Sequence, residues 1–352
     1  MKALRVGLLG CGRIAQRYVE VFRDEVKGAV VTAVCDRVTE RADRRAGELG
    51  ARAVYDLADL LGAADVDVVA ILTESGRHAE HAEQVLGAGK HAIVEKPPAM
   101  FPHQVVRCER IAAEARLMYA VILQNRFNPA MRALRAAHEA RRFGRPVLAT
   151  VRLRWCRFQD YYEDGWHGTW RLDGGVLSQQ AIHHLDALQW ICGPVEEVVC
   201  AQANALNRLE AEDTAVATLR FRNGFLGAIE ATTAARPEDL EASISVLGET
   251  GFAVVGGIAL NEVQAWRFQQ PRPEDETASV MFSQKVPTGY GLSHGPLLQE
   301  IVDRIRAGRL DPPIRGEDSL DALRLIHALY ASAERGGWVK VNDQTSSTRL
   351  GR

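Results

Sequence analysis

An apolar run at residues 4–9 breaks at a glycine-rich turn, Gly10 to Ala15, and a helix-forming stretch follows at once. This order of strand, tight turn and helix start constrains the fold more than any other feature of the chain. The first glycine permits the turn, and the second lets the backbone approach a pyrophosphate that the first helical amides face. The turn therefore predicts a dinucleotide site whose residues are Gly10, Gly12, Arg13 and Ile14.

An acidic residue follows the second apolar run. Residues 30–35 have the composition of a buried strand, and Asp36 comes directly after them. A carboxylate at this position binds the hydroxyls of an adenosine ribose and repels a 2'-phosphate, so the pattern favours NAD over NADP. The adjacent Arg37 is a guanidinium able to bind that phosphate, and Asp36 is also explicable as a loop acid or a helix cap. We expect both residues at the cofactor.

Composition narrows the class of protein. The chain has 352 residues, of which 47% are hydrophobic and 25% are charged, as in a globular protein of roughly two domains. The net charge of -2, with no basic block, argues against nucleic acid or an acidic membrane surface as a partner. Six cysteines are scattered without paired spacing, which is typical of reduced thiols in the cytoplasm. We expect neither a secretion signal nor a membrane span, because no apolar run approaches about 18 residues.

Up to residue 123, short apolar runs alternate with amphipathic patterns of helical period. This alternation predicts a doubly wound parallel sheet of the Rossmann type over residues 1–123. The predicted strands lie near 4–9, 30–35, 67–72, 91–95 and 118–123.

Beyond residue 124 the runs alternate in polarity, as strands with one buried face do. Two of them flank Asn223-Gly224, the preferred dipeptide of a hairpin turn. Residues 124–341 are therefore predicted to form an α+β domain on a mainly antiparallel sheet, one face of which is a candidate subunit interface. The polar residues 342–352 are predicted to fray.

Polar residues follow the strand ends, where ligands bind in a doubly wound sheet. Lys96 comes after the run at 91–95 and is the first catalytic candidate, because a lysine at this edge reaches the nicotinamide half of a dinucleotide. It is also explicable as a surface lysine before a proline-fixed turn. The residues assigned to the cofactor at the same edge are Thr73, His78, Glu95 and Asn125.

The stretch from Asp173 to Asp186 has the pattern of one helix entered through two glycines. His183 shares a polar face with Gln179 and Asp186, whereas His184 lies on an apolar stripe and is expected in the core. Adjacent histidines point apart on a helix, and the chain has no H-E-x-x-H motif, so we expect no metal site. His183 is the second catalytic candidate.

Four motifs together resemble those of the Gfo/Idh/MocA-type oxidoreductases, over nearly the whole chain. They are the turn at Gly10, the Glu95-Lys96-Pro97 signature, the segment Asn125-Arg126-Phe127-Asn128 and the glycine-led helix that carries His183. The resemblance implies an NAD-binding Rossmann domain, a sheet-forming second domain and homodimers or homotetramers. It also implies that Lys96 and His183 flank the sugar carbon that exchanges a hydride with the nicotinamide.

A narrower resemblance, in the segments 161–186 and 231–237, is to bacterial nucleotide-sugar 3-dehydrogenases that act on UDP-N-acetyl-2-amino-2-deoxyglucuronate. It implies oxidation of the C3 hydroxyl of UDP-N-acetylglucosamine uronate to a ketone, which an aminotransferase then consumes in surface polysaccharide biosynthesis. The substrate contacts that it implies in this chain are Lys96, Arg126, Tyr162, Gln179 and His183.

Two residues depart from that narrower pattern. Gln179 stands where the wider family often has Asp and this subgroup often has Asn, which removes an acid partner of His183. His167 stands where Arg is expected, and an imidazole does not bind a uronate carboxylate bidentately as a guanidinium does. The sugar is therefore the least constrained part of the prediction.

Oxidation of an alcohol needs a base for the hydroxyl proton as well as a hydride acceptor. Histidine has an ordinary pKa of about 6.5 and lysine one of about 10.4, so we predict that His183 takes the proton and Lys96 positions the hydroxyl. The reverse assignment stays open. The alternative functions are another sugar or inositol dehydrogenase, an NAD-dependent glycosidase of the same family and, less favoured, a non-enzymatic dinucleotide-binding regulator.

Overall fold

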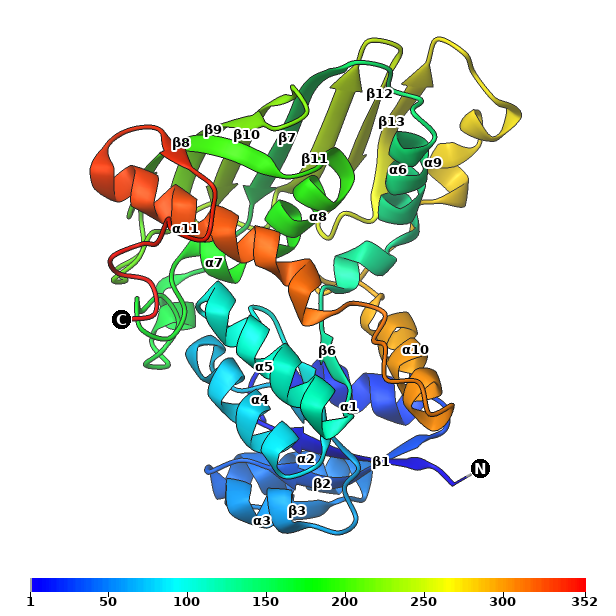
Figure 1. The fold of residues 1–352 in the computed structure, drawn as a ribbon, viewed down its shortest axis with the longest axis vertical. Coiled ribbons are helices and arrows are strands. Elements are labelled where there is room, and N and C mark those ends of the chain that lie inside the picture. Colours follow the sequence, from blue (N-terminus) through cyan, green and yellow to red (C-terminus); the bar gives the residue numbers. More distant parts are fainter. Residues whose placement is uncertain (1) are drawn as a thin grey trace. The chain divides into compact units, whose positions relative to one another are not determined.

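The computed structural model describes residues 2–352, which form two compact units (Figure 1). The first unit contains the chain up to residue 123 together with residues 293–320. The second unit contains residues 124–292 and 321–352. The sequence-based limits place residues 293–320 in the second domain, whereas in the structure this segment folds with the first unit.

The first unit is built on a parallel sheet of six strands in the order β3-β2-β1-β4-β5-β6. The predicted doubly wound sheet is confirmed, with one strand more than the apolar runs indicate. The additional strand, β3, has only three residues, of which only Val54 is buried, so it leaves no apolar run. The strands are β1 Leu4–Leu9, β2 Ala29–Cys35, β3 Arg52–Val54, β4 Val68–Ile71, β5 His91–Val94 and β6 Tyr119–Val121.

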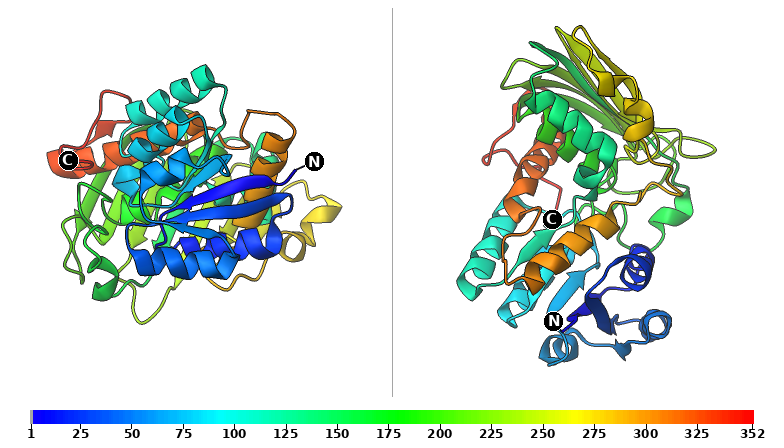
Figure 2. Two further views of the ribbon diagram at one scale, coloured as in Figure 1. Left: turned by 90° about the horizontal axis from the view of Figure 1, so that it is seen from below. Right: turned by 90° about the vertical axis from the view of Figure 1, so that its right-hand side faces the viewer.

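Helices cover both faces of this sheet, with α4 and α5 on one face and the earliest helices on the other (Figure 2). The α5 helix begins with Pro102 at its first turn and buries Val105, Cys108 and Ala112 on one stripe. The helices of this unit are α1 Ala15–Glu20, which continues as a π-helical turn Val21–Glu25, α2 Thr39–Leu49, α3 Leu57–Gly62, α4 His78–Gly87, α5 Pro102–Ala115 and α10 His294–Arg306.

The second unit is built on a mixed sheet of eight strands in the order β13-β12-β11-β7-β10-β9-β8-β14. Its neighbouring strands are antiparallel except for β7 and β10, so the predicted mainly antiparallel sheet is confirmed. The strands β9 and β10 pair on either side of Asn223-Gly224, as the turn predicts. The strands are β7 Pro146–Arg154, β8 Val195–Ala203, β9 Thr214–Phe221, β10 Leu226–Thr232, β11 Glu241–Gly248, β12 Gly251–Gly256, β13 Glu262–Phe268 and β14 Val339–Lys340.

The helices α6, α7 and α8 contact one face of the eight-stranded sheet (Figure 1). In α8 every residue except Trp190 is buried, so this helix forms the centre of the core of the second unit. No helix within residues 2–352 combines the length and the apolar character that a membrane crossing needs. The helices are α6 Pro129–Glu139, α7 Val176–Gln179, α8 Ile182–Cys192, α9 Ala278–Met281 and α11 Leu320–Arg335.

The C-terminal segment 342–352, which the sequence predicts to fray, makes specific contacts with the rest of the second unit. Thr348 donates to the Glu334 carboxylate of α11 through its amide and its hydroxyl, both at 2.8 Å. The amide of Gly351 donates to the Trp170 carbonyl at 2.8 Å, and Leu350 is buried. The polar groups of this segment pair with the folded chain, which composition alone does not show.

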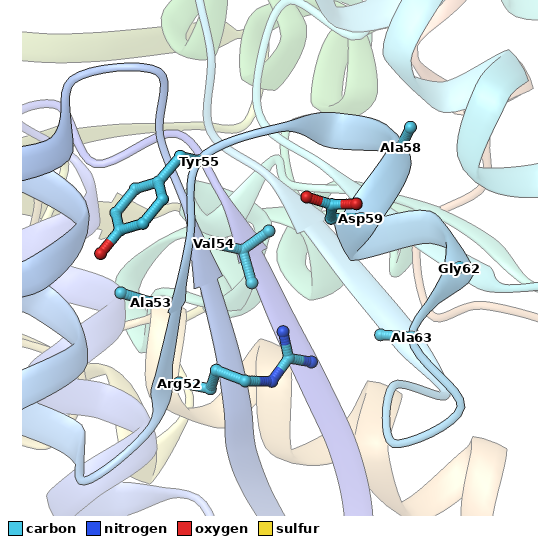
Figure 3. Close-up of a pocket in the computed structure, with 8 residues that line it drawn as sticks. All are labelled: Arg52, Ala53, Val54, Tyr55, Ala58, Asp59, Gly62 and Ala63. Carbon is cyan, nitrogen blue, oxygen red and sulfur yellow. The ribbon is translucent and has the colours of Figure 1, made fainter.

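A shallow hollow opens beside β3 and α3 (Figure 3). Arg52 pairs with Asp65 at 3.0 Å, and the Tyr55 hydroxyl donates to Asp43 at 2.8 Å. Arg52 and Tyr55 are therefore engaged with neighbouring residues that do not line the hollow.

Candidate active site

The glycine turn after β1 has a separate role for each glycine. Gly10 has a φ of 98°, and a Cβ atom there would lie 2.8 Å from the backbone of Leu72. The fold itself therefore requires this glycine. A Cβ atom on Gly12 would meet no atom within 4 Å, so the second glycine keeps open a space beside the helix start. This open space fits a pyrophosphate that approaches the backbone, as the dinucleotide prediction requires.

Asp36 ties the end of β2 to this turn. Its carboxylate accepts hydrogen bonds from the amides of Cys11 and Val38, both at 2.8 Å. The neighbouring Arg37 lies 3.2 Å from the Glu74 carboxylate, which follows β4. Since β1 lies between β2 and β4, this ion pair joins two strand-end loops on either side of the turn. Asp36 thus holds the loop in place, and its contact with a ribose stays a prediction.

His78 joins the loops that follow β4 and β5. Its Nδ1 lies 2.7 Å from the Pro97 carbonyl and its Nε2 lies 2.9 Å from the Thr73 carbonyl. Burial lowers the pKa of His78, although the two carbonyls oppose that shift. The Thr73 hydroxyl contacts His81 Nδ1 at 2.8 Å. With both ring nitrogens engaged by the protein, His78 acts on the site through the loops that it holds.

Lys96 follows β5 and is anchored through its neighbour Glu95. The Glu95 carboxylate is buried and accepts from the Tyr18 hydroxyl at 3.0 Å and the Lys96 amide at 3.2 Å. His294 Nε2 of α10 lies 3.5 Å from the same carboxylate. Burial opposes ionisation, but His294, Lys96 and Tyr18 together hold the pKa of Glu95 below its ordinary value. Glu95 is therefore a buried, ionised anchor next to Lys96, and its contact with the cofactor stays a prediction.

In the second unit, His183 is the second residue of α8 and is buried. The amide nitrogen Nε2 of Gln124 lies 3.4 Å from Nε2 of His183. Next to Gln124, the Oδ1 atom of Asn125 is buried and has no hydrogen-bond partner among the residues that the structure describes. A buried oxygen in this condition is consistent with a ligand that Asn125 binds.

The predicted single helix from Asp173 to Asp186 is wrong, because the chain forms two short helices with a break at residues 180–181. Gln179 ends α7 and donates to Asp173 at 2.7 Å. Asp186 of α8 is engaged by Arg126 in a bidentate ion pair of 2.9 and 2.6 Å. The polar face predicted around His183 is therefore largely paired within the protein. His184 is fully buried and contacts Trp155, as expected for a core residue.

Aromatic side chains precede α7. The Tyr162 hydroxyl lies 2.7 Å from the Thr233 hydroxyl, and burial raises the pKa of Tyr162 to about 12. His167 Nδ1 lies 2.6 Å from the Asp164 carboxylate, and its ring centroid is 3.7 Å from that of Trp166. The residue that replaces the expected arginine is thus held by a carboxylate and by a close, tilted contact with an indole.

The sequence prediction missed the buried residues that support this site. Tyr18 and His294 support Glu95, and Gln124 contacts His183. Tyr18 lies in an apolar helical pattern, and His294 is far from Lys96 in sequence. Only Gln124 could have been identified from the sequence, because it directly follows the predicted strand at 118–123 and ligands bind at strand ends.

Comparisons with known proteins agree with this geometry. The model of the Gfo/Idh/MocA oxidoreductase family for the NAD-binding Rossmann fold matches residues 4–123, and that for the C-terminal alpha/beta domain matches residues 137–341. The chain is 30% identical to inositol 2-dehydrogenase 3 of Saccharopolyspora erythraea over 203 residues, and the match spans 56% of each chain.

Two solved structures are similar to nearly the whole chain. The WlbA dehydrogenase from Bordetella pertussis, in complex with NADH and UDP-GlcNAcA, is 35% identical with a TM-score of 0.90, covering 97% of this chain and 98% of that chain. The WlbA dehydrogenase from Chromobacterium violaceum, in complex with the same two ligands, is 33% identical with a TM-score of 0.89, covering 97% of both chains. The chain therefore belongs to the Gfo/Idh/MocA oxidoreductase family and is an enzyme that uses NAD as its cofactor.

Proposed function

We propose that the enzyme oxidises the C3 hydroxyl of UDP-N-acetylglucosamine uronate (UDP-GlcNAcA) to a ketone. The observation that carries this proposal is the likeness, at 35% identity over 97% of the chain, to a dehydrogenase crystallised with NADH and UDP-GlcNAcA. The two residues proposed to react are both present in this chain, with Lys96 after β5 and His183 at the start of α8.

Bound NAD supplies the hydride acceptor. Gly10, Gly12, Arg13 and Ile14 would hold its pyrophosphate, and Asp36 and Arg37 would bind the adenosine ribose, with Thr73 and Asn125 as further contacts. As the C3 hydride leaves, His183 Nε2 accepts the hydroxyl proton, and the Lys96 ammonium polarises the forming carbonyl. The Gln124 amide, whose nitrogen lies 3.4 Å from His183 Nε2, holds the imidazole until the substrate hydroxyl replaces this contact. The reverse assignment, with Lys96 as the base, is distinguished by the pH dependence of turnover in a Lys96→Arg variant.

The other predicted substrate contacts, Arg126, Tyr162 and Gln179, carry internal hydrogen bonds. Their partners are Asp186, Thr233 and Asp173. We assign these three residues to the substrate side of the site, where they order α7, α8 and the preceding loop. In this proposal Lys96 and His183 make the contacts to the reacting hydroxyl.

A second candidate is an inositol dehydrogenase. The similarity to an inositol 2-dehydrogenase favours it, as does His167, because a free polyol has no carboxylate for an arginine to bind. The two candidates separate when purified enzyme with NAD is given UDP-GlcNAcA or myo-inositol and NADH absorbance is followed. Turnover of UDP-GlcNAcA alone supports the first function, and turnover of myo-inositol alone overturns it.

We also propose that a second copy of the chain covers one face of the eight-stranded sheet. Leu226, Leu148, Leu247 and Phe252 are direct neighbours across β10, β7, β11 and β12, and Leu226 and Phe252 are exposed. A row of apolar side chains on an open sheet is typical of a subunit interface. A Leu226→Glu, Phe252→Glu double variant is expected to sediment as a smaller species than the wild type, and an unchanged mass contradicts this interface.

The ketone product would pass to an aminotransferase.

A further inference from the structure

The α7 helix begins without a local cap. The residue before its first turn is Gly175, which has no side chain to accept a hydrogen bond. Nevertheless three successive amides are paired. Gly175 donates to the Tyr330 hydroxyl, Val176 to the Glu212 carbonyl and Leu177 to the Glu212 carboxyl, each at 2.9 Å. The helix is therefore capped by two residues that are distant in sequence.

Glu212 and Tyr330 form one buried unit under this helix start. The Tyr330 hydroxyl donates to Oε1 of Glu212 at 3.0 Å, and both side chains are almost completely inaccessible. A Cβ atom on Gly175 would lie 2.1 Å from the Glu212 carbonyl oxygen and 2.3 Å from Oε2. The glycine is thus required by the close approach of Glu212, and the helix start has no room to shift toward it.

The capped helix leads directly to His183. Within α7 the Gln179 amide donates to the Gly175 carbonyl at 2.9 Å, and at the break the Ala181 amide donates to the Val176 carbonyl at 2.8 Å. The first turn of α8 then begins at Ala181, whose carbonyl accepts from His184 and Leu185. A displacement of the start of α7 therefore moves the start of α8.

We propose that Glu212 and Tyr330 are positioning residues for His183, acting as a remote cap that fixes α7 and through it the first turn of α8. The inference rests on the role proposed for His183. Unlike His183, Glu212 and Tyr330 need not contact the substrate in this proposal.

The surroundings of Glu212 specify its protonation state. The titratable groups that face it are Asp173 before α7, Tyr330 on α11 and Cys200 on β8, and none of them is a cation. Burial raises the pKa of Glu212 to about 8. At neutral pH the carboxyl carries a proton, with Oε1 as the oxygen that accepts from Leu177 and Tyr330. Glutamine reproduces this arrangement, whereas alanine removes the acceptor.

The test compares Glu212→Gln, Glu212→Ala and Tyr330→Phe with a matched control, Glu334→Gln. The control changes a carboxylate of α11 that pairs with the C-terminal segment and not with α7. We expect Glu212→Ala and Tyr330→Phe to lower kcat by roughly tenfold or more, because small misplacement of a catalytic group is costly, with little change in the KM for NAD. Glu212→Gln should keep kcat at neutral pH and lose the alkaline decline that ionisation of Glu212 causes.

Hydrogen exchange of the amides at residues 175–185 gives a readout that does not need turnover. In Tyr330→Phe these amides should exchange faster than in the wild type, and in Glu334→Gln they should not. If the wild type fails to oxidise UDP-GlcNAcA, this exchange still decides whether the cap exists. Unchanged exchange in Glu212→Ala and Tyr330→Phe overturns the cap, and faster exchange with an unchanged kcat in an active enzyme overturns its role in positioning His183.

Discussion

Lys96 and His183 are each supported by a buried tyrosine and glutamate, but the two glutamates have different surroundings. In the first unit, Tyr18 donates to Glu95 at 3.0 Å, and in the second unit Tyr330 donates to Glu212 at the same distance. Glu95 also faces His294, whereas Glu212 faces Asp173. The pKa of Glu95 is held below its ordinary value, and burial raises that of Glu212 to about 8.

The comparison indicates that the neighbouring charged groups decide the charge of a buried carboxyl. Burial disfavours the charged form in both places, and a tyrosine hydrogen bond is common to both. Only Glu95, which has both His294 and Lys96 nearby, retains the carboxylate. We therefore expect the support of Lys96 to depend on a charged carboxylate and the support of His183 to depend on a neutral hydrogen bond.

The largest expected effect comes from the two supported residues themselves. Lys96→Ala and His183→Ala should each lower kcat by roughly 10²–10⁴, the usual contribution of a positioned acid or base. NADH binding, followed by fluorescence titration, should persist in His183→Ala. His103→Ala is a matched control, because this histidine is exposed on α5. Full turnover in either variant would contradict the comparison, because the supported residue would then not be needed for the reaction.

Removing the histidine from the Glu95 pair tests whether its carboxylate is charged. His294→Phe keeps an aromatic ring beside Tyr18 but leaves a buried charge without its partner. Loss of one member of a buried ion pair typically costs about 3–5 kcal/mol of the free energy of unfolding, measured by denaturant titration. The double variant Glu95→Gln, His294→Phe should recover part of that loss. Equal stability of the single and double variants would mean that Glu95 is neutral.

The two glutamates should give opposite pH dependences of stability. The folded chain keeps a proton on Glu212 that the unfolded chain releases above the ordinary pKa of 4.5, so wild-type stability falls between about pH 4.5 and 8 through this group. The free energy of unfolding of Glu212→Gln, relative to that of the wild type, should therefore rise by up to about 4 kcal/mol from pH 5 to pH 8.

Glu95 has the opposite sign. Its lowered pKa means that its contribution to stability is present at neutral pH and is lost as the pH falls through the folded-state pKa. The difference in unfolding free energy between wild type and Glu95→Gln should consequently shrink in acid. Parallel pH profiles for the two glutamine variants would contradict the distinction between the two supports.

The smallest expected effect concerns the choice of cofactor. The side chain of Arg37 is 77% exposed and pairs with Glu74, and such pairs contribute about 0–1 kcal/mol. Glu74→Gln releases the guanidinium, so the ratio of kcat/KM for NADP to that for NAD should rise by no more than about fivefold. Arg37→Ala should show no such rise. A larger increase would mean that Glu74 itself repels the 2'-phosphate.

The sequence predicts what local patterns encode. The strand ends that carry Asp36 and Lys96 follow apolar runs, and Gly10 is required by a turn with a positive φ. The three-residue strand β3 was missed because a strand of that length leaves no periodic signal. The break between α7 and α8 was missed because the segment keeps helical spacing on both sides of it.

The supports of the site could not be predicted from the sequence for a different reason. Glu212 and Tyr330 lie 118 positions apart, and seven of the eight strands of the second sheet lie between Glu95 and His294 in sequence. A buried glutamate is indistinguishable in sequence from an exposed one, because its pairing depends on tertiary contacts. The sequence therefore offers candidates for the reacting residues, which stay predictions, and gives no signal for the residues that hold them.

Transfer of deuterium from the sugar to the cofactor tests the central claim most directly. UDP-GlcNAcA labelled with deuterium at C3 is mixed with enzyme and NAD, and the reduced cofactor is analysed by mass spectrometry. Direct hydride transfer from C3 predicts reduced cofactor that carries the deuterium, in an amount equal to the ketone formed. Reduced cofactor without deuterium, or none at all, would contradict the account.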